Sequence, residues 1–494
     1  MSFAQRRLWF AFQMEGPSPT YNAPLYVRLS GELDRAALTA AVNDVVERHE
    51  VLRTRFAEVD GEPVQVVEPV AAPAMEFVEL EGDLSRALAE RARYCFDLAA
   101  EIPLRVTLFE VAEREHVLLF MLHHIAGDGW SMGPLARDLS TAYGARCAGR
   151  APEWEPLPVQ YADYARWQEE VLGSADDPDS LMAEQLAFWR GALVGAPELL
   201  ELPVDRPRPA VASHRGATVR FSVDAGTHSG LVALARASDV TVFMVVQAAL
   251  AVLLSRLGAG TDIPLGTAVA GRTDEALDDL VGFFVNTLVL RTDVSGDPTF
   301  RELLARVRET DLAAYAHQDV PFERVVEAVN PGRSLSHAPL FQVLLTLQNN
   351  AAGEFAIPGI DASFGEVDTG VAKVDLTFYL EERHTPDTTP AGLTGEIQYA
   401  VDLFERDSAQ TMAARFVRVL SALVSAPDRA VSAVDVLDAD ERRTLLHDRN
   451  ATARTVPAAT VTELFEEWAG RVPDAPAVVF GDVVVTYGVV EERA

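Results

Sequence analysis

The sequence predicts a mixed α/β fold built as two lobes of similar construction. Three observations support this: strand-like runs alternate with helical patterns, an irregular stretch near residue 175 interrupts them, and the second half then repeats the alternation. A chain of 494 residues is long enough for two or three domains with sizeable cores. We expect an N-terminal lobe over residues 1–175 and a C-terminal lobe over residues 176–440.

Strand and helix signals follow one another through the first half. The runs Ala23–Leu29 and Val64–Val67 predict strands, with a helix between them that Asp34 caps. The run Val117–Leu122 is continuous and apolar, which is typical of a strand buried on both faces. Another helix is expected to begin at the cap Ser131, because apolar residues recur at four-residue spacing beyond it.

The second half repeats this style after a less regular region, Gly173–Pro209, in which only a short helix near Met182–Leu193 is expected. Two strands and two helices are then predicted in alternation. They are Thr218–Val223 as strand, Thr241–Leu257 as buried helix, Leu288–Thr292 as strand and Phe300–Ala316 as helix.

The pattern changes again after about residue 440. Residues 441–460 are polar and predict a linker. Beyond it, Leu464–Trp468 indicates a helix, and the runs Ala477–Phe480 and Val483–Tyr487 indicate two strands joined by a Gly-Asp turn. So few residues cannot close a domain, so we expect residues 461–494 to be the truncated start of a further domain in a longer protein.

Composition excludes several classes of function. The net charge of -32 repels phosphate backbones and anionic lipids, so neither nucleic acid nor a membrane is an expected partner. Lys373 is the only lysine, which leaves little room for Schiff-base or P-loop chemistry. Cys95 and Cys147 cannot form a disulfide scaffold or a cysteine-rich zinc site, and no segment of about eighteen apolar residues occurs. We expect a cytoplasmic location.

The densest acid/base cluster runs from His123 to Gly129 and has the pattern HHxxxDG. It follows the buried strand, so if both histidines still belong to that strand, one ring points into a cleft and the other into packing. Only one of them is then expected to do chemistry. Asp128 is too short to reach His124 across the loop, and we expect it to hold the loop by pairing with an arginine elsewhere.

Two other kinds of site compete for the same residues. Gly129–Gly133 satisfies the G-x-S-x-G nucleophile elbow of α/β-hydrolases, with Ser131 as nucleophile, but polar residues intervene between strand and serine. A metal site on His123, His124 and Asp128 lacks a further ligand, and neighbouring strand histidines diverge. We expect no metal.

Six motifs, taken in order, are specific to one family. They are Ser2–Trp9, Arg48–Phe56, His123–Ser131, Tyr161–Tyr164, Val281–Thr287 and His317–Glu323. On these motifs the chain resembles the condensation domains of nonribosomal peptide synthetases. The paired histidines and the residues after them favour this type over heterocyclization and epimerization domains. The tail from Val461 to Ala494 is similar to the opening of an adenylation domain.

The resemblance implies a fold and an activity. The fold is a V-shaped pseudodimer of two chloramphenicol-acetyltransferase-like lobes, with the active site in the tunnel between them. The activity is amide-bond formation between an acyl or peptidyl thioester donor and an aminoacyl thioester acceptor. The implied partners are upstream and downstream peptidyl carrier domains, whose phosphopantetheine arms carry the substrates, and a downstream adenylation domain. No cofactor is expected on this domain itself.

The resemblance also assigns roles to residues. The expected site residues are His124, His123, Asp128 and Gly129 as catalytic, Trp130, Ser131 and Asn286 as substrate-binding, and Arg48 and Arg53 as structural support that pairs with Asp128. His124 serves either as a base or as a hydrogen-bond anchor for the amine. The Gly129 N–H and the Ser131 hydroxyl are expected to face the oxyanion. Asn286 either lines the cleft or meets backbone groups. A non-catalytic domain that only gates or recruits carriers and associated enzymes stays an alternative.

Overall fold

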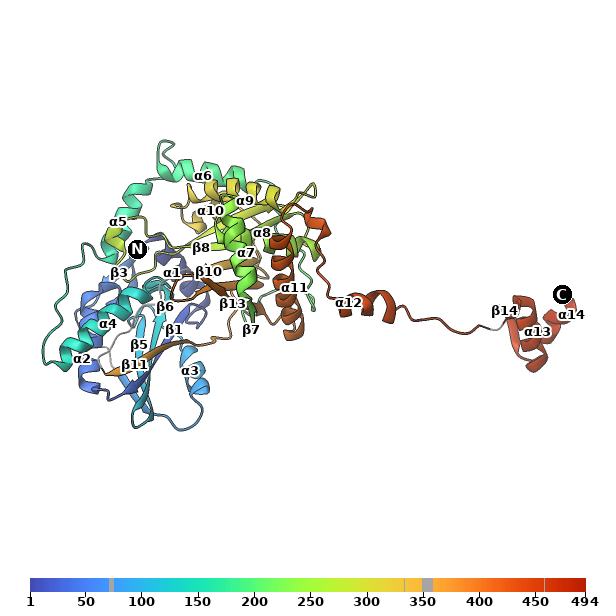
Figure 1. The fold of residues 1–494 in the computed structure, drawn as a ribbon, viewed down its shortest axis with the longest axis horizontal. Helices are drawn as coiled ribbons and strands as arrows, with labels where there is room; N and C mark the ends of the chain where they lie inside the picture. Colours follow the sequence, from blue (N-terminus) through green and yellow to red (C-terminus); the bar gives the residue numbers. More distant parts are fainter. Residues whose placement is uncertain (71–74, 333, 349–358, 457) are drawn as a thin grey trace. The chain divides into compact units, whose positions relative to one another are not determined.

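The computed structural model describes residues 1–494 except 71–74, 333, 349–358 and 457. The chain divides into two compact units, Met1–Val436 and Leu437–Ala494. The larger unit holds two main sheets and the helices that cover them (Figure 1). Among the described residues, no single helix has the length and apolar character to span a membrane, although the bent pair α7 (Ala225–Ala237) and α8 (Val242–Arg256) passes that test jointly.

The first sheet has five strands in the order β11-β1-β6-β5-β4. Its strands are β1 (Asn22–Gly31), β4 (Met75–Glu79), β5 (Leu104–Ala112), β6 (Glu115–His123) and β11 (Ile360–Glu366). The central β6 is buried from its second residue to its end, as its continuous apolar run predicts. Alternate side chains of a strand point to opposite faces, so β6 contributes to two apolar clusters.

Helices cover both faces of this sheet. They are α1 (Phe3–Glu15), α2 (Arg35–Arg48), α3 (Leu84–Ala92) and α4 (Met132–Cys147). Asp34 caps α2 by accepting the N–H groups of Ala36 and Ala37, as predicted. The 3-10 turn η1 (Glu50–Arg53) leads into a separate hairpin of β2 (Thr54–Val59) and β3 (Glu62–Val67).

The second sheet has six strands in the order β7-β13-β12-β10-β8-β9. They are β7 (Gly216–Val223), β8 (Asp262–Val269), β9 (Asn286–Asp293), β10 (Val343–Gln348), β12 (Leu376–His384) and β13 (Pro390–Ala400). Its helices are α7 (Ala225–Ala237), α8 (Val242–Arg256), α9 (Phe300–Tyr315) and α11 (Arg406–Ser425). The predicted buried helix is α8, which Thr241 caps and whose residues 244–254 are all buried.

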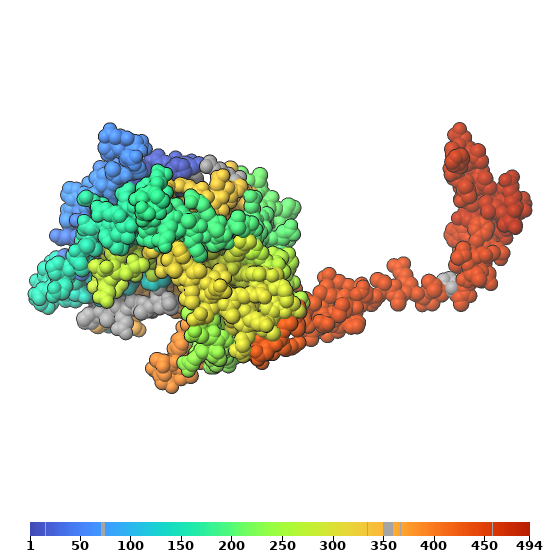
Figure 2. All heavy atoms as spheres, turned by 90° about the horizontal axis from the view of Figure 1, so that it is seen from above, coloured from blue at the N-terminus to red at the C-terminus, as the bar shows by residue number. Residues whose placement is uncertain are grey.

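The two sheets do not separate at residue 175. Strand β11, from the second half of the chain, pairs antiparallel with β1 and forms an edge of the first sheet. Leu277, Val281 and Phe284, also from the second half, lie in the core of that sheet. The helices α5 (Tyr161–Leu172), α6 (Leu181–Ala192) and α10 (Phe322–Val329) are joined by a third apolar cluster. In Figure 2 the green-teal and yellow parts of the chain adjoin on one face of this unit.

The unit Leu437–Ala494 has its own short elements. They are α12 (Ala439–Arg443), a π-helical turn over Thr444–Asp448, α13 (Val461–Arg471), β14 (Pro476–Phe480), β15 (Val483–Thr486) and α14 (Tyr487–Arg493). The helix and the strand hairpin predicted for residues 461–494 are confirmed, with Gly481 in the turn at a φ of 58°. The expected linker, residues 441–460, begins inside the helical turns.

Candidate active site

The end of β6 places the two histidines in different surroundings. His123 is only 5% exposed, and its ring lies 6.3 Å from that of Tyr21 and 6.1 Å from that of Phe96, measured between centroids. Its Nδ1 accepts the Ile125 N–H at 3.2 Å. Burial, with a smaller contribution from the positive charge of Lys373, lowers the pKa of His123 to about 3. His123 is therefore a neutral packing residue.

His124 begins the 3-10 turn η2 (His124–Ala126), and its ring is half-buried, 6.0 Å from that of Phe283. Its backbone N–H donates to the Tyr21 carbonyl at 2.8 Å. Its Nδ1 lies 3.2 Å from the Gly127 carbonyl oxygen. A carbonyl oxygen only accepts, so Nδ1 carries the proton and Nε2 of the neutral ring has a free lone pair.

Electrostatics keep the His124 ring neutral. Burial lowers its pKa well below the ordinary value, and the nearby charge of Lys373 lowers it further. A ring with such a pKa carries almost no proton near pH 7. It is therefore well suited to accept a hydrogen bond, or a proton from a strongly acidic group, at Nε2.

Asp128 joins the histidine loop to a segment more than 150 residues away. It is 2% exposed, and its Oδ1 accepts the backbone N–H of Ser131 at 2.9 Å. Its Oδ2 accepts the N–H groups of Phe284 at 2.9 Å and Val285 at 3.3 Å. The buried Arg272 supplies the positive charge, with Nη2 at 3.6 Å from Oδ1. The carboxylate thus anchors residues 284–285 beside the loop.

The expectation that Asp128 pairs with Arg48 or Arg53 is wrong. Arg48 lies at the C-terminal end of α2, next to α4, and its Nε donates to Asp138 at 2.8 Å. Arg53 instead donates to Glu50 and to the carbonyl of Glu68. Both arginines therefore stabilise neighbouring helix and hairpin contacts in the first half, out of reach of the Asp128 carboxylate.

His49 is buried and also binds Asp138, through Nε2 at 2.8 Å. It is therefore a packing residue.

Ser131 does not face a substrate. Its side chain is buried, and its hydroxyl lies 2.8 Å from both the Asp128 Oδ1 and the Gly282 carbonyl, either of which it can donate to. It accepts the Gly282 N–H and an Arg272 N–H, each at 3.1 Å. Ser131 begins α4 without a side-chain cap bond. Both proposed roles of this hydroxyl, as hydrolase nucleophile and as oxyanion donor, are wrong because the surrounding polar groups occupy it.

Gly129 and Trp130 form the tip of the loop. Gly129 is exposed, and Trp130 is half-buried. Both are therefore open to a substrate, and their roles stay predictions.

Asn286 meets backbone groups, one of the two alternatives expected for it. Its Nδ2 donates to the carbonyls of Gln318 and Val320, both at 2.8 Å. Its Oδ1 accepts the N–H groups of Thr287 at 2.9 Å and Phe322 at 3.0 Å. The side chain also borders a cavity, but its polar atoms are already engaged. It clamps the start of β9 to the turn before α10.

This cavity has a volume of about 60 Å³. Residues of α1 and α5 line it together with segments 283–287 and 318–323. Arg7 and Glu323 form an ion pair of 3.0 Å on its wall. Phe283 lies on this wall and also contacts the His124 ring, so the cavity and the histidine share a boundary residue.

Sequence reasoning missed Arg272, Tyr21 and Lys373 as neighbours of the motif. Arg272 and Lys373 lie more than 100 residues from His124 in sequence, and no local pattern marks them. The one available signal was that Lys373 is the only lysine in an arginine-rich chain.

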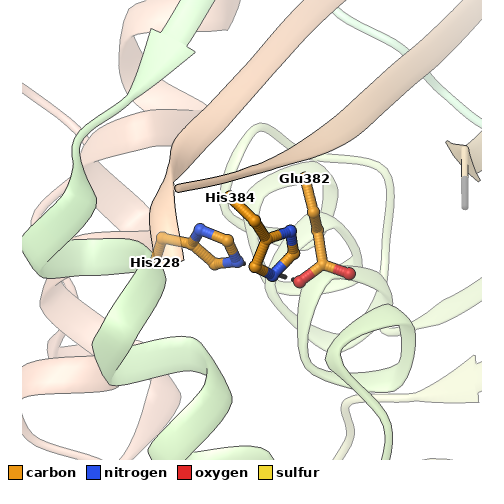
Figure 3. A group of neighbouring side chains, drawn as sticks. All are labelled: His228, Glu382 and His384. Carbon is orange, nitrogen blue, oxygen red and sulfur yellow. Dashed lines mark hydrogen bonds and ion pairs between the residues drawn. The ribbon is translucent and has the colours of Figure 1, made fainter. Parts of the chain in front are cut away.

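One cluster outside this site has a set of side chains that metals favour. His228 of α7 lies beside Glu382 and His384 of β12, with potential ligand atoms within 4.8 Å of one another (Figure 3). However, the Gly392 N–H donates to His228 Nδ1 at 3.2 Å, so Nε2 carries the proton that it donates to Glu382 at 2.9 Å. A metal-binding histidine instead donates from its second nitrogen. The cluster is therefore a hydrogen-bonded structural group.

Comparisons with known proteins agree with the motifs. A family model for the condensation domain matches residues 1–446. All of the chain aligns, at 53% identity over 495 residues, with the probable non-canonical nonribosomal peptide synthetase CymA of Salinispora arenicola. The chain spans only 6% of the length of that relative.

Solved structures share the fold. The X-domain from teicoplanin biosynthesis is 40% identical with a TM-score of 0.83, over 88% of this chain and 97% of that one. A four-domain nonribosomal peptide synthetase bound to AMP and glycine is 25% identical with a TM-score of 0.85, over 99% of this chain and 37% of that one. The mixed α/β prediction is confirmed by this likeness. The chain belongs to the condensation domain family of nonribosomal peptide synthetases.

Proposed function

We propose that this chain forms a peptide bond between a carrier-bound acyl or peptidyl thioester and the amine of a carrier-bound aminoacyl thioester. The observation that carries the proposal is the state of His124. Its ring is half-buried, neutral and fixed by Gly127 in the tautomer with a free Nε2 lone pair. A group that accepts a proton from an attacking amine needs this arrangement.

The protein needs to supply little covalent chemistry in this reaction, because a thioester is already activated. The amine nitrogen attacks the carbonyl carbon and forms the new C–N bond, which places negative charge on the carbonyl oxygen. The proton that the amine nitrogen loses passes to His124 Nε2. The C–S bond then breaks, and the departing thiolate recovers the proton. The protein supplies orientation and a proton acceptor.

The low pKa of His124 favours one of its two expected roles. An α-amine has a pKa near 8, so roughly a tenth is neutral at pH 7, and selecting that form costs about 1.4 kcal/mol. A histidine with a much lower pKa cannot deprotonate an ammonium efficiently, but it can hold a neutral amine by a hydrogen bond. We therefore assign it as the amine anchor, which accepts the proton only after attack.

The loop next to His124 is the proposed substrate contact. Gly129 is exposed, and its backbone N–H is proposed to bind the oxyanion, with half-buried Trp130 beside it. Substrates arrive on phosphopantetheine arms of the two carrier partners, and no cofactor is held by this domain. Residues 461–494 are proposed to begin an adenylation domain, an assignment supported by the match of 99% of the chain to a four-domain synthetase.

The test supplies donor and acceptor thioesters on carrier domains and follows carrier-bound products by mass spectrometry. We expect wild-type protein to yield the joined product and His124→Ala to lose most of it while keeping its circular dichroism and melting temperature. The matched control is His337→Ala, which removes another half-buried histidine that hydrogen-bonds a backbone carbonyl. An unchanged yield from His124→Ala would refute the role.

A recruiting domain is the second candidate. It is favoured by the 40% identity to the teicoplanin X-domain, which has also been solved in complex with OxyB. A recruiter would form no amide with any matched pair of thioesters, and His124→Ala would leave its partner binding unchanged. The same product assay therefore separates the two functions.

A further inference from the structure

Lys373 places a positive charge next to the histidine motif. It lies between β11 and β12, and its Nζ sits 5.2 Å from the centroid of the Tyr21 ring. The carbonyl of the same Tyr21 accepts the backbone N–H of His124. A cation from the second half of the chain thus reaches the residue that anchors the His124 turn.

In the part of the chain that the structure describes, no carboxylate lies within ion-pair distance of Lys373. Asp375, two residues along, is engaged by Arg208, and Glu323 of α10 is engaged by Arg7 of α1. The other titratable groups near Lys373 are Arg7, already paired with Glu323, and His123 and His124, which are neutral because the pKa of each is lowered.

The charge of Lys373 acts on both histidines of the motif. Although water reaches the side chain, desolvation by the surrounding protein lowers the pKa of Lys373 from 10.5 to about 8, and the charge of Arg7 contributes. The charge of Lys373 in turn lowers the pKa of both His123 and His124. The surroundings of His124 therefore disfavour any further positive charge.

We infer that Lys373 makes the site electropositive so that the α-amine of the acceptor is held beside His124 in its neutral, nucleophilic form. This rests on the proposed function. An ammonium group entering next to an unpaired cation is destabilised, whereas the neutral amine is not. Lys373 is a positioning residue that acts through its field and forms no bond in the reaction.

The positive charge of Lys373 should change the rate of amide formation in a defined direction. Removing the cation raises the pKa of the bound amine toward its free value near 8, so a smaller fraction is nucleophilic at low pH. The acid limb of the pH–rate profile should then move to higher pH by about one unit, which is about tenfold in rate below the amine pKa. At high pH the amine is neutral with or without the lysine, so the rates converge.

The experiment measures single-turnover amide formation from about pH 6 to about pH 9 for wild type, Lys373→Met and Lys373→Arg. We expect the acid limb of Lys373→Met to move upward and that of Lys373→Arg to stay near wild type. Arg383→Met is the matched control, since it removes an exposed cation on β12. An aminooxy acceptor, whose nitrogen is unprotonated across this range, should react equally well with both lysine variants.

A second measurement needs no turnover. The pKa of a ¹⁵N-labelled aminoacyl-pantetheine analogue, read by NMR when bound, should lie below its free value in wild type and rise in Lys373→Met. Superimposable profiles, or a rate loss equal at every pH, would overturn the inference while leaving amide synthesis in place. A wild-type protein that forms no amide at any pH would overturn the proposed function itself.

Discussion

Replacing Asp128 with asparagine should cost this protein much of its stability. The carboxylate is nearly inaccessible and accepts hydrogen bonds from Ser131, Phe284 and Val285. Asparagine keeps one acceptor oxygen and replaces the other with an amide that can only donate. If the amide nitrogen takes the place of Oδ2, it faces the N–H groups of Phe284 and Val285. All of these groups are donors, so the two backbone N–H groups lose their acceptor.

The magnitude follows from what is left unpaired. Each buried N–H that loses its acceptor costs about 1–3 kcal/mol. Arg272 loses its negative partner, and breaking a buried ion pair from one side costs about 3–5 kcal/mol. These contributions share partners and do not add. We therefore expect the free energy of unfolding to fall by about 3–5 kcal/mol.

Urea denaturation followed by tryptophan fluorescence measures this loss. A double-mutant cycle with Arg272→Met isolates the pair, because removing both charges should recover part of the loss from Asp128→Asn. Asp176→Asn, at an exposed carboxylate, is the control and should change little. An Asp128→Asn protein within about 1 kcal/mol of wild type would show that the carboxylate does not anchor residues 284–285.

Three further predictions concern buried groups. Burial raises the pKa of Asp311 from 3.8 to about 7. Between these two pH values the folded state keeps a proton that the unfolded chain has lost, so the free energy of unfolding falls as the pH rises from 3.8 to about 7. Asn at this position can exchange two hydrogen bonds with Gln247, as the protonated acid would. Asp311→Asn should therefore have a higher free energy of unfolding than wild type, by up to about 4 kcal/mol at pH 8 and by less at pH 5, as measured by urea titration. Ser131 should resist labelling by a fluorophosphonate, and a labelled Ser131 peptide in the mass spectrum would contradict its burial. A methyl group at Gly282 would meet the Tyr161 ring at 2.1 Å, so Gly282→Ala should lower stability by about 1–3 kcal/mol or more, and an unchanged melting temperature would count against this packing.

Local patterns predicted local structure well. The apolar run before His123 became β6, and the cap Asp34 begins its helix as expected. Such features depend on residues that lie within one or two turns of each other in the chain. The ordered motifs located the candidate site for a different reason, because they match a known family.

Contacts between residues that lie far apart in the sequence could not be predicted from it. Arg48 was a reasonable partner for Asp128 on its position in a motif, but the partner is Arg272, which nothing nearby in sequence marks. Ser131 was assigned to the substrate because it starts a helix beside the histidines. Its burial depends on Gly282, about 150 residues away, and no periodicity encodes that meeting.

The pairing of β11 with β1 has a consequence for protein engineering. A chimera that swaps only the first half of this domain would pair β1 of one parent with β11 of the other. Where the side chains of the two strands do not fit, β1 would lose this pairing and offer its backbone groups to other molecules, which invites aggregation. Productive crossover points must therefore transfer residues 360–366 together with residues 22–31, or leave both in place.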